Sequence, residues 1–385
     1  MYIIKRIRLA VTVFILVFFI LNSNMYVFAQ VDIQARSAVL MEASTGNVLY
    51  EKNADVPVPP ASITKLMTLL LGFEAIDQGK AKWDDLVPVS EKAWKVEGSR
   101  MFLEVGSKVR YEDIITGISV VSANDGCVAL AEYLYGSENA FVQVMNRRAQ
   151  EIGLANTHFA NSNGLPAEGH RMSARDIAVL ARYLIQKYPQ ILKIESMREY
   201  TYNNISQNNR NPLLGVFPGA DGLKTGWTEE AGYCLVGTAQ QNGIRMISVV
   251  LNTKDESERL SVSQELLDYG FKNFEIVDVK SKGDIVDYLK VRKGKEQEVA
   301  VKLDDSISIL IPSIKKDDLE IVTLKSVDSL EAPVSAGTNV GKLEVRLDGE
   351  TLASADISTA GDVSKAGFFE LLFRAIGEFL QSIFK

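Results

Sequence analysis

The chain has 385 residues, of which 46% are hydrophobic and 24% are charged, and this composition is typical of a globular protein long enough for two domains. Its formal net charge of −7 and the lack of a long basic run argue against nucleic-acid binding. Since it has only two histidines and no Cys/His cluster at metal-ligand spacing, we expect neither a zinc site nor another cofactor.

The first 29 residues have the pattern of a signal peptide. Three cations lie near the start, and the apolar run Leu9–Leu21 that follows is too short to span a bilayer comfortably. Val27-Phe28-Ala29 then places small or apolar residues before a cleavage point. An uncleaved anchor is the alternative, and in either case we expect the rest of the chain to lie outside the cytoplasm.

The exported part begins with a hairpin signal, because the apolar runs Ser37–Met41 and Val48–Tyr50 flank the turn Ser44–Asn47. Two prolines end the extended segment that follows. A helix is predicted from about Ser62 to Gln78. It is apolar on most sides and should therefore be a central buried helix.

Ser62 and Lys65 would lie on the same face of this helix, because they are three residues apart. A hydroxyl beside an amine is a nucleophile beside a base, provided that burial or a neighbouring cation lowers the pKa of the lysine. The pattern is common, however, and its simpler interpretation is a helix start at which Ser62 is the N-cap.

Further helices and strands are predicted along the catalytic part. Acids in its first turn favour a helix from Tyr111 to near Val120. Asn124-Asp125-Gly126 is a sequence typical of turns that interrupt helices, which predicts that Ser122 and Asn124 lie on a short loop between helices. Residues 200–222 should be mostly loop. The other predicted elements are helices at about Cys127–Tyr135, Glu138–Ile152, Ser173–Tyr188 and Glu256–Tyr269 (stopped by Gly270), strands at Gly232–Ala239 and Ile244–Asn252, and an edge strand at Asp221–Gly226.

The two cysteines, Cys127 and Cys234, each lie in an apolar run and are far apart in the sequence. Two cysteines do not form a disulfide framework, so we expect buried free thiols. A single disulfide is the alternative in an exported protein.

After about Phe274 the composition shifts to alternating β runs separated by charged turns, which predicts a small all-β domain over residues 274–360. The runs are Ile285–Val291, Glu298–Leu303, Ile307–Ile311, Leu319–Leu324 and Leu343–Leu347. We find no pairing of a nucleophile with a base in this part.

The last stretch, residues 361–385, predicts an amphipathic helix with a narrow polar stripe. Its polar residues recur every three or four positions and therefore share one side at about 100° per residue. The rest is mainly Phe, Leu and Ile, so the helix could pack on the body, mediate dimerisation or lie in a membrane surface, and we favour the membrane. The stripe consists of Glu370, Arg374, Glu378, Gln381 and Lys385.

Three short motifs stand in a characteristic order, Ser62-Ile63-Thr64-Lys65, Ser122-Ala123-Asn124 and Lys224-Thr225-Gly226. With them the chain resembles the penicillin-binding protein and serine β-lactamase superfamily, whose motifs are S-x-x-K, S-x-N and K-T-G. Within it, the resemblance is closest to the low-molecular-weight D-alanyl-D-alanine carboxypeptidases, in particular to Gram-positive sporulation-type members. Further matching stretches are Ser37–Leu40, Pro60–Ser62, Asn163–Leu165, Asp221–Gly226 and Leu266–Phe271.

This resemblance implies an α/β (α+β) catalytic domain over residues 30–273, with an antiparallel sheet and a cluster of helices. Ser62 would be the nucleophile and Lys65 its base, since the chain has no G-x-S-x-G motif and few histidines for a Ser-His-Asp triad. Lys224 would help to keep Lys65 neutral by like-charge repulsion. Ser122 could relay a proton to the leaving amine.

Substrate binding is expected along the third motif. Asn124 could hydrogen-bond the substrate backbone or Lys65, and the strand that begins at Lys224 and continues through Thr225 and Gly226 could pair with an extended peptide. The resemblance places the oxyanion hole at the backbone N–H groups of Ser62 and Trp227. The Trp227 ring could instead line the entrance, or be only a surface aromatic.

A carboxypeptidase must also bind a terminal carboxylate, and an arginine is a better bidentate partner for it than a lysine. The candidates are Lys224, Arg210 and Arg259, and the resemblance places arginines at the last two positions. An exposed ion pair is the alternative role for each arginine.

We therefore predict a serine-type carboxypeptidase that removes the terminal D-alanine from peptidoglycan stem peptides through an acyl-enzyme on Ser62 and binds β-lactams covalently. It should lie at the outer face of the cytoplasmic membrane. A β-lactamase is one alternative, but it usually needs a positioned glutamate, and the only E-x-x-x-N, Glu199 to Asn203, comes late in the chain. The other alternative is a catalytically inactive wall- or membrane-binding protein, which the intact motifs oppose.

Overall fold

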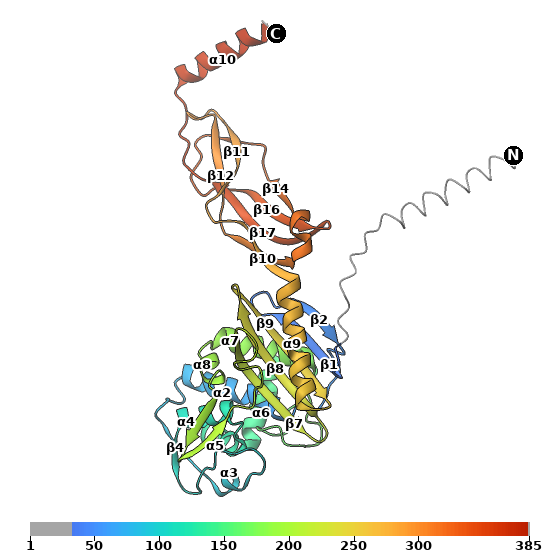
Figure 1. Ribbon diagram of the computed structural model, residues 1–385. Helices are drawn as coiled ribbons and strands as arrows, with labels where there is room; N and C mark the ends of the chain where they lie inside the picture. The colour runs from blue at the N-terminus through green and yellow to red at the C-terminus, as the bar shows by residue number, and fades with distance from the viewer. Residues whose placement is uncertain (1–32, 384–385) are drawn as a thin grey trace, which may run out of the picture. The chain divides into compact units, whose positions relative to one another are not determined.

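The computed structural model describes residues 33–383 (Figure 1), so the expected signal peptide over residues 1–29 lies outside the described residues. A five-stranded antiparallel sheet with the strand order β2-β1-β9-β8-β7 organises the first part of the chain. The predicted hairpin, the two strands near residues 232–252 and the edge strand are all confirmed. The strands are β1 (Ser37–Glu42), β2 (Val48–Lys52), β7 (Ala220–Thr228), β8 (Gly232–Gln241) and β9 (Ile244–Thr253).

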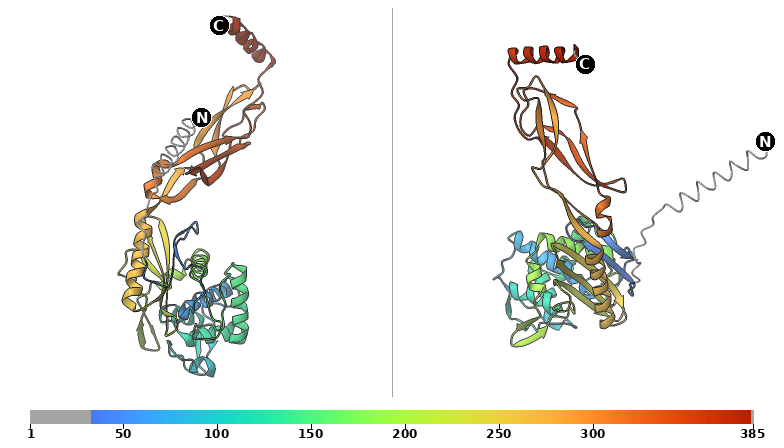
Figure 2. Two further views of the ribbon diagram at one scale, coloured as in Figure 1. Left: turned by 90° about the vertical axis from the view of Figure 1, so that its right-hand side faces the viewer. Right: turned by 45° about the horizontal axis from the view of Figure 1, so that its top comes forward.

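Helices cover both faces of this sheet, and its central strands are therefore buried on both sides. Neighbouring residues of a strand point to opposite faces. On β1, Val39 and Met41 join the core that contains the helical cluster, whereas Leu40 lies against α9 (Glu256–Asn273). Figures 1 and 2 show α9 running along the sheet over β8 and β9, with which it packs.

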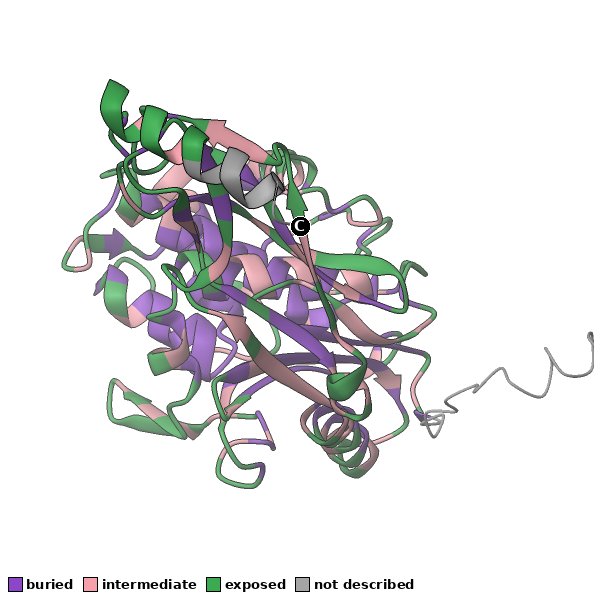
Figure 3. Cartoon of the chain, turned by 90° about the horizontal axis from the view of Figure 1, so that it is seen from above, coloured by how far each residue is buried: buried purple, intermediate pink, exposed green. Residues whose placement is uncertain are grey.

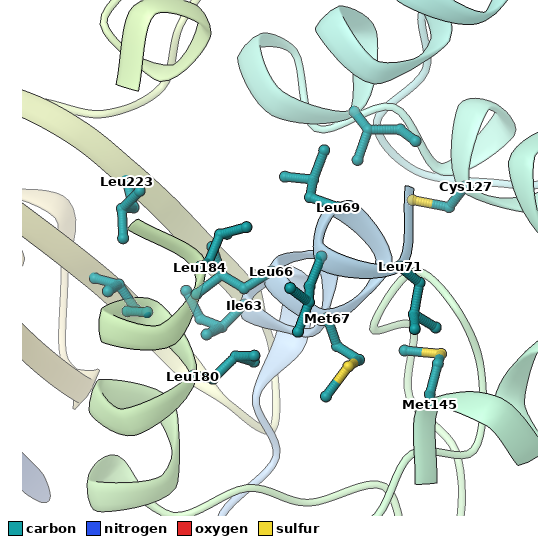
Figure 4. Close-up of a cluster of buried hydrophobic side chains, with 14 of the residues drawn as sticks. Ile63, Leu66, Met67, Leu69, Leu71, Cys127, Met145, Leu180, Leu184 and Leu223 are labelled. Atoms are coloured by element: carbon teal, nitrogen blue, oxygen red, sulfur yellow. The ribbon is translucent and has the colours of Figure 1, made fainter. Parts of the chain in front are cut away.

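The predicted central helix is confirmed as α2 (Lys65–Asp77), preceded by the 3₁₀ turn η1 (Ala61–Thr64). Its leucines and Met67 are fully buried between the surrounding helices (Figure 4). Burial of such a side chain stabilises the fold by roughly 1.5–3 kcal/mol, so the packing of α2 contributes strongly to the stability of this part of the chain. The other helices here are α3 (Glu91–Lys95), α4 (Tyr111–Val120), α5 (Asn124–Tyr135), α6 (Glu138–Glu151), α7 (Ala174–Lys187) and α8 (Ile191–Glu195).

The predicted break at Asn124-Asp125-Gly126 is wrong, because these residues form the first turn of α5. The Asp125 carboxylate accepts hydrogen bonds from the backbone N–H groups of Met101 and Leu103, each at 3.0 Å. A carboxylate in the first turn is also favoured by the helix dipole. Ser122 does lie on the connection between α4 and α5, as predicted, but Asn124 belongs to the helix.

Two other boundaries differ from the prediction. The segment expected to be mostly loop after residue 200 contains the hairpin of β5 (Glu199–Tyr202) and β6 (Ile205–Asn208). Helix α9 continues past Gly270, because this glycine permits close packing rather than ending the helix. A Cβ atom at Gly270 would lie 3.0 Å from Cδ2 of Leu40 on β1. A separate two-stranded antiparallel sheet pairs β3 (Leu86–Pro88) with β4 (Lys108–Arg110), which are joined by a connection that contains α3.

Both cysteines are buried free thiols, and the disulfide alternative is wrong. Cys127 lies on α5 beside the core of α2 (Figure 4), whereas Cys234 lies on β8.

The chain from Phe274 onward is rich in β-structure, as predicted, and has a hydrophobic core of its own. It contains a six-stranded sheet with the order β14-β16-β17-β12-β11-β15 and the separate pair β10–β13. Strands β10, β15 and β17 were not predicted, and β17 carries mainly small and polar residues that give a weak pattern. The proposed boundary between residues 273 and 274 stays a prediction. The elements are β10 (Phe274–Lys280), β11 (Ile285–Arg292), β12 (Glu298–Leu303), β13 (Ile307–Pro312), η2 (Ser313–Asp318), β14 (Glu320–Lys325), β15 (Ser329–Glu331), β16 (Asn339–Leu347) and β17 (Glu350–Thr359).

A terminal helix, α10 (Phe368–Ile383), is present as predicted. Phe368, Phe369 and Phe373 at its start are exposed, with Phe368 74% and Phe373 70% exposed, and Figure 3 shows this part of the helix in the colour of exposed residues. The Arg374 guanidinium donates to the backbone carbonyls of Gly294 and Lys295 at 2.8 and 2.7 Å. Over residues 33–383, no helix combines the length and apolar character needed to cross a membrane.

Candidate active site

Ser62 and Lys65 are brought into direct contact at the junction of η1 and α2. The Nζ atom of Lys65 lies 2.8 Å from Oγ of Ser62, and it also donates to the carbonyl oxygen of Asn163 at 2.6 Å. The alternative role of Ser62 as a helix cap is wrong, because Pro60 occupies the N-cap position of this turn. A hydroxyl and an amine at this distance have the geometry of a nucleophile and its base.

Lys65 is fully buried, and burial lowers the pKa of its ammonium group to about 7. The positive charges of Lys224 and Arg210 act in the same direction, whereas the negative charge of Asp125 acts against it. A large fraction of Lys65 is therefore neutral near pH 7, as a general base requires.

Ser122 and Asn124 present polar atoms that have no protein partner. The Ser122 hydroxyl and the Oδ1 atom of Asn124 are buried without a hydrogen bond in the described part of the chain. The Asn124 amide nitrogen donates one N–H to the carbonyl of Glu97 at 2.7 Å, and no hydrogen bond joins Asn124 to Lys65 among the described residues. An unsatisfied buried group costs roughly 1–3 kcal/mol, and a bound substrate could satisfy both atoms.

The third motif lies on the edge strand β7, directly against the nucleophile turn. A Cβ atom at Gly226 would lie 3.0 Å from the carbonyl oxygen of Pro60 and 3.2 Å from Cβ of Ala61, so a glycine allows this close approach. Trp227 is 57% exposed, and its ring centroid lies 6.0 Å from that of Tyr233. The edge position leaves one side of β7 free for an added strand.

Lys224 on β7 is buried, and near it lies the buried carboxyl group of Glu195, which the sequence analysis did not single out. Glu195 on α8 is fully buried, and its Oε1 atom accepts a hydrogen bond from the Ser119 hydroxyl at 3.0 Å. Burial lowers the pKa of Lys224 and raises that of Glu195. The opposite charge of each partner counteracts both shifts, so the protonation of each group depends on the charge of the other.

The predicted residues converge on one cavity of about 560 Å³. Lys65 and Lys224 are buried and do not line this cavity, but Lys65 contacts Ser62, which does. The Arg259 side chain is buried, approaches Glu256 at 3.6 Å and leaves its Nε without a partner. Arg210 is exposed, and no carboxylate pairs with it among residues 33–383. The predicted residues that line the cavity are Ser62, Ser122, Asn124, Arg210, Thr225, Gly226, Trp227 and Arg259.

The E-x-x-x-N pair of the β-lactamase alternative lies away from the cavity, and the described residues contain no cluster of metal ligands. Glu199 and Asn203 lie on the β5–β6 hairpin and do not line the cavity. No group of three or more His, Cys, Asp or Glu side chains in residues 33–383 could hold a metal ion.

Sequence reasoning missed the role of the loop at residues 160–170. Asn163–Leu165 is one of the stretches that carry the family resemblance, but no pattern in the sequence indicated that the Asn163 carbonyl accepts a hydrogen bond from Lys65. The same loop carries His170, a buried histidine behind the nucleophile turn. A backbone acceptor and a lone histidine leave no sequence pattern that could have identified them.

Comparison with known proteins places the chain among peptidases of the cell wall. A family model described as D-alanyl-D-alanine carboxypeptidase matches residues 24–255, and one described as Penicillin-binding protein 5, C-terminal domain, matches residues 274–365. The D-alanyl-D-alanine carboxypeptidase DacF of Bacillus subtilis is 40% identical over 355 residues, which cover 90% of each chain.

Solved structures agree with this placement. The crystal structure of penicillin binding protein 5 from Haemophilus influenzae superposes with a TM-score of 0.73 at 36% identity, over 86% of this chain and 98% of that chain. Penicillin-Binding Protein D2 from Listeria monocytogenes, solved in an ampicillin-bound form, superposes with a TM-score of 0.57 at 32% identity, over 62% of this chain and 98% of that chain. The expected combination of an α/β catalytic part, a β-rich part and a terminal helix is thereby confirmed.

Proposed function

Because the chain belongs to the D-alanyl-D-alanine carboxypeptidase family of serine peptidases, we propose that Ser62, Lys65, Ser122 and Lys224 carry out its reaction. The chain is a serine-type D-Ala-D-Ala carboxypeptidase, and the family implies a D-Ala-D-Ala peptide as substrate and β-lactams as covalent ligands. The observation that carries the assignment of roles is the buried Lys65 amine at 2.8 Å from the Ser62 hydroxyl.

Acylation begins when neutral Lys65 takes the proton of Ser62 Oγ. The oxygen attacks the carbonyl carbon between the two D-alanines, and the N–H groups of Ser62 and Trp227 stabilise the oxyanion. Ser122 relays this proton from Lys65 to the departing amine, so that D-alanine leaves, Lys65 is neutral again, and the shortened peptide stays as an ester on Ser62. Water then attacks this ester, releases the peptide and restores the Ser62 hydroxyl.

The substrate backbone is proposed to lie beside β7 as an added strand. Thr225, Gly226 and Trp227 line the cavity on this edge strand, as does Asn124, whose buried Oδ1 has no hydrogen-bond partner among the described residues and could accept one from the substrate. Main-chain hydrogen bonds would hold the peptide in register. High-performance liquid chromatography of a diacetyl-Lys-D-Ala-D-Ala digest tests the activity, since the products expected are D-alanine and the peptide shortened by one residue.

Arg210 is our candidate for binding the terminal carboxylate, because its guanidinium lines the cavity and has no carboxylate partner among the described residues. Arg259 already approaches Glu256. A charge-assisted hydrogen bond contributes roughly 1.5–3 kcal/mol. We therefore expect Arg210→Ala to raise KM about 10-fold to 100-fold for a peptide acid but to leave KM unchanged for its C-terminal carboxamide.

The matched variant is Arg259→Ala, measured on the same two substrates. A selective loss for the acid in Arg259→Ala, with Arg210→Ala unaffected, would transfer the role to Arg259. An equal rise of KM for the acid and the amide in both variants would show that neither arginine binds the terminal carboxylate.

We also propose that the enzyme works at the outer face of the cytoplasmic membrane, held there by α10. The exposed phenylalanines of α10 and its narrow polar stripe support an orientation in the plane of the lipid surface. The signal peptide pattern over residues 1–29 supports export.

A chain that ends after Gly367 tests this anchor. Since the catalytic residues lie far earlier in the sequence, the truncated protein should move from the membrane fraction to the soluble fraction and acylate with penicillin at the wild-type rate. Phe369→Glu combined with Phe373→Glu should release the full-length chain in the same way, because two charges would enter the apolar face. Truncated protein that stays in the membrane fraction would contradict the proposal.

A further inference from the structure

His170 is a buried histidine that the proposed mechanism does not use. Only 6% of it is exposed, and its ring packs edge-on against Phe159 with centroids 5.9 Å apart. The backbone N–H of Ala160 donates to its Nδ1 atom at 3.1 Å. Nδ1 is therefore unprotonated, and the proton of the neutral ring lies on Nε2.

From Nε2 a chain of hydrogen bonds runs to the residue before the nucleophile. The Nε2–H group donates to Oγ1 of Thr64 at 2.7 Å, and the Thr64 hydroxyl donates to the carbonyl oxygen of Ala61 at 2.8 Å. Thr64 is fully buried, so water does not compete for these bonds. Burial lowers the pKa of His170 to about 4, so one neutral tautomer persists at neutral pH.

Ala61 has an unusual backbone that needs such support. Its φ is +48°, in the left-handed region that residues with a side chain rarely adopt. The loop also contacts it directly, because a Cβ atom at Gly164 would lie 1.9 Å from the Ala61 carbonyl oxygen. Gly164 itself has a φ of +86°, so a glycine is required there for two reasons.

The orientation of the Ala61 carbonyl decides where the N–H of Ser62 points. The two groups belong to the same planar trans peptide unit and therefore point in opposite directions. Thr64 binds the carbonyl on the buried side. The N–H of Ser62 therefore points away from the buried side, and Ser62 itself lines the catalytic cavity.

We propose that His170 and Thr64 are positioning residues, which hold the peptide unit between Ala61 and Ser62 so that the Ser62 N–H is aimed at the oxyanion. This inference rests on the proposed role of Ser62 as the nucleophile and of its N–H group in the oxyanion hole. Thr64 and His170 act through the backbone and do not touch the substrate.

The test compares Thr64→Val, which has nearly the same shape but no hydroxyl, with Thr64→Ser, which keeps the hydroxyl. Stopped-flow acylation by a fluorescent penicillin separates the acylation rate constant from the affinity of the non-covalent complex. We expect Thr64→Val to lower the rate constant about 100-fold to 1000-fold, the usual effect of losing an oxyanion-hole donor. The affinity and the pH midpoint of acylation should stay the same, because Lys65 is untouched, and Thr64→Ser should acylate nearly as fast as the wild type.

The histidine is tested by His170→Gln and His170→Leu. The glutamine amide can accept from Ala160 and donate to Thr64, so it should restore most of the rate, whereas leucine should resemble Thr64→Val. Thr68→Val is the matched control for stability. It removes a buried bond from α2, the helix that follows Thr64, to the same loop, between Thr68 Oγ1 and the Ser162 carbonyl at 2.5 Å. It should lower the melting temperature but change the acylation rate less than twofold.

Two outcomes would overturn the inference. One is an acylation rate in Thr64→Val within twofold of wild type. The other is an equal loss of rate in Thr68→Val, which would indicate general destabilisation. The proposed function fails by a different observation, namely wild-type protein that penicillin does not acylate at Ser62, whatever the Thr64 variants do.

Discussion

Ser62→Ala is expected to lower the release of D-alanine about 10⁴-fold or more and to abolish penicillin labelling. Alanine has no oxygen that can form the ester, and an enzyme without its nucleophile keeps only the contribution of binding and of the oxyanion hole. The measurement is steady-state kcat/KM for a D-Ala-D-Ala peptide together with the fraction of protein labelled. The Lys65 amine would lose one of its two hydrogen-bond partners but keep the Asn163 carbonyl, so the fold should persist.

Ser137→Ala is the control for this experiment. Ser137 is the N-cap of α6, where its hydroxyl accepts a hydrogen bond from the Ala140 N–H at 3.2 Å. Its loss should cost about 1 kcal/mol of stability and leave kcat/KM unchanged. Labelling of Ser62→Ala at more than a few per cent of the wild-type level would show that another residue is the nucleophile.

Lys65→Arg is expected to reduce acylation about 10³-fold or more at every accessible pH. A general base must be neutral, and the guanidinium group stays protonated throughout this range. In the wild type, the pKa of Lys65 is lowered to about 7, so the protonated, inactive form dominates below that pH. Acylation should therefore rise as the pH increases through about 7 and then level off, rather than rise near the value of 10.5 for a free lysine.

The measurement is the second-order rate constant of acylation between pH 5 and pH 9. Lys187→Arg on the exposed face of α7 is the control and should keep the wild-type profile. An acylation rate in Lys65→Arg within tenfold of wild type would contradict the role of Lys65 as the base. So would a wild-type profile without a rise near neutral pH.

The sequence was sufficient for those parts of the fold that repeat a local pattern. The runs at β1, β8 and β9 are apolar and bounded by turns, and α2 is long and apolar, so length and composition separated strand from helix. The motif residues could be assigned because serine and lysine three positions apart must be neighbours at a helix start. Their convergence with Lys224 required the resemblance, since no spacing rule joins positions so far apart.

The errors and omissions arose where tertiary contacts override local signals. Asp125 helps to begin α5 by binding N–H groups of residues more than twenty positions earlier. Gly270 lies within α9 because Leu40 packs closely against it. Glu195 and His170 matter because they are buried beside other residues, and burial of a single polar residue cannot be read from its neighbours in the sequence.

The most direct test of the central claim is to locate the covalent adduct. The wild-type protein is incubated with benzylpenicillin, digested, and its peptides are sequenced by mass spectrometry. The account predicts one penicilloyl group per chain on Ser62, released only slowly. An adduct on another residue, no adduct at all, or rapid catalytic turnover of penicillin by unmodified enzyme would contradict it.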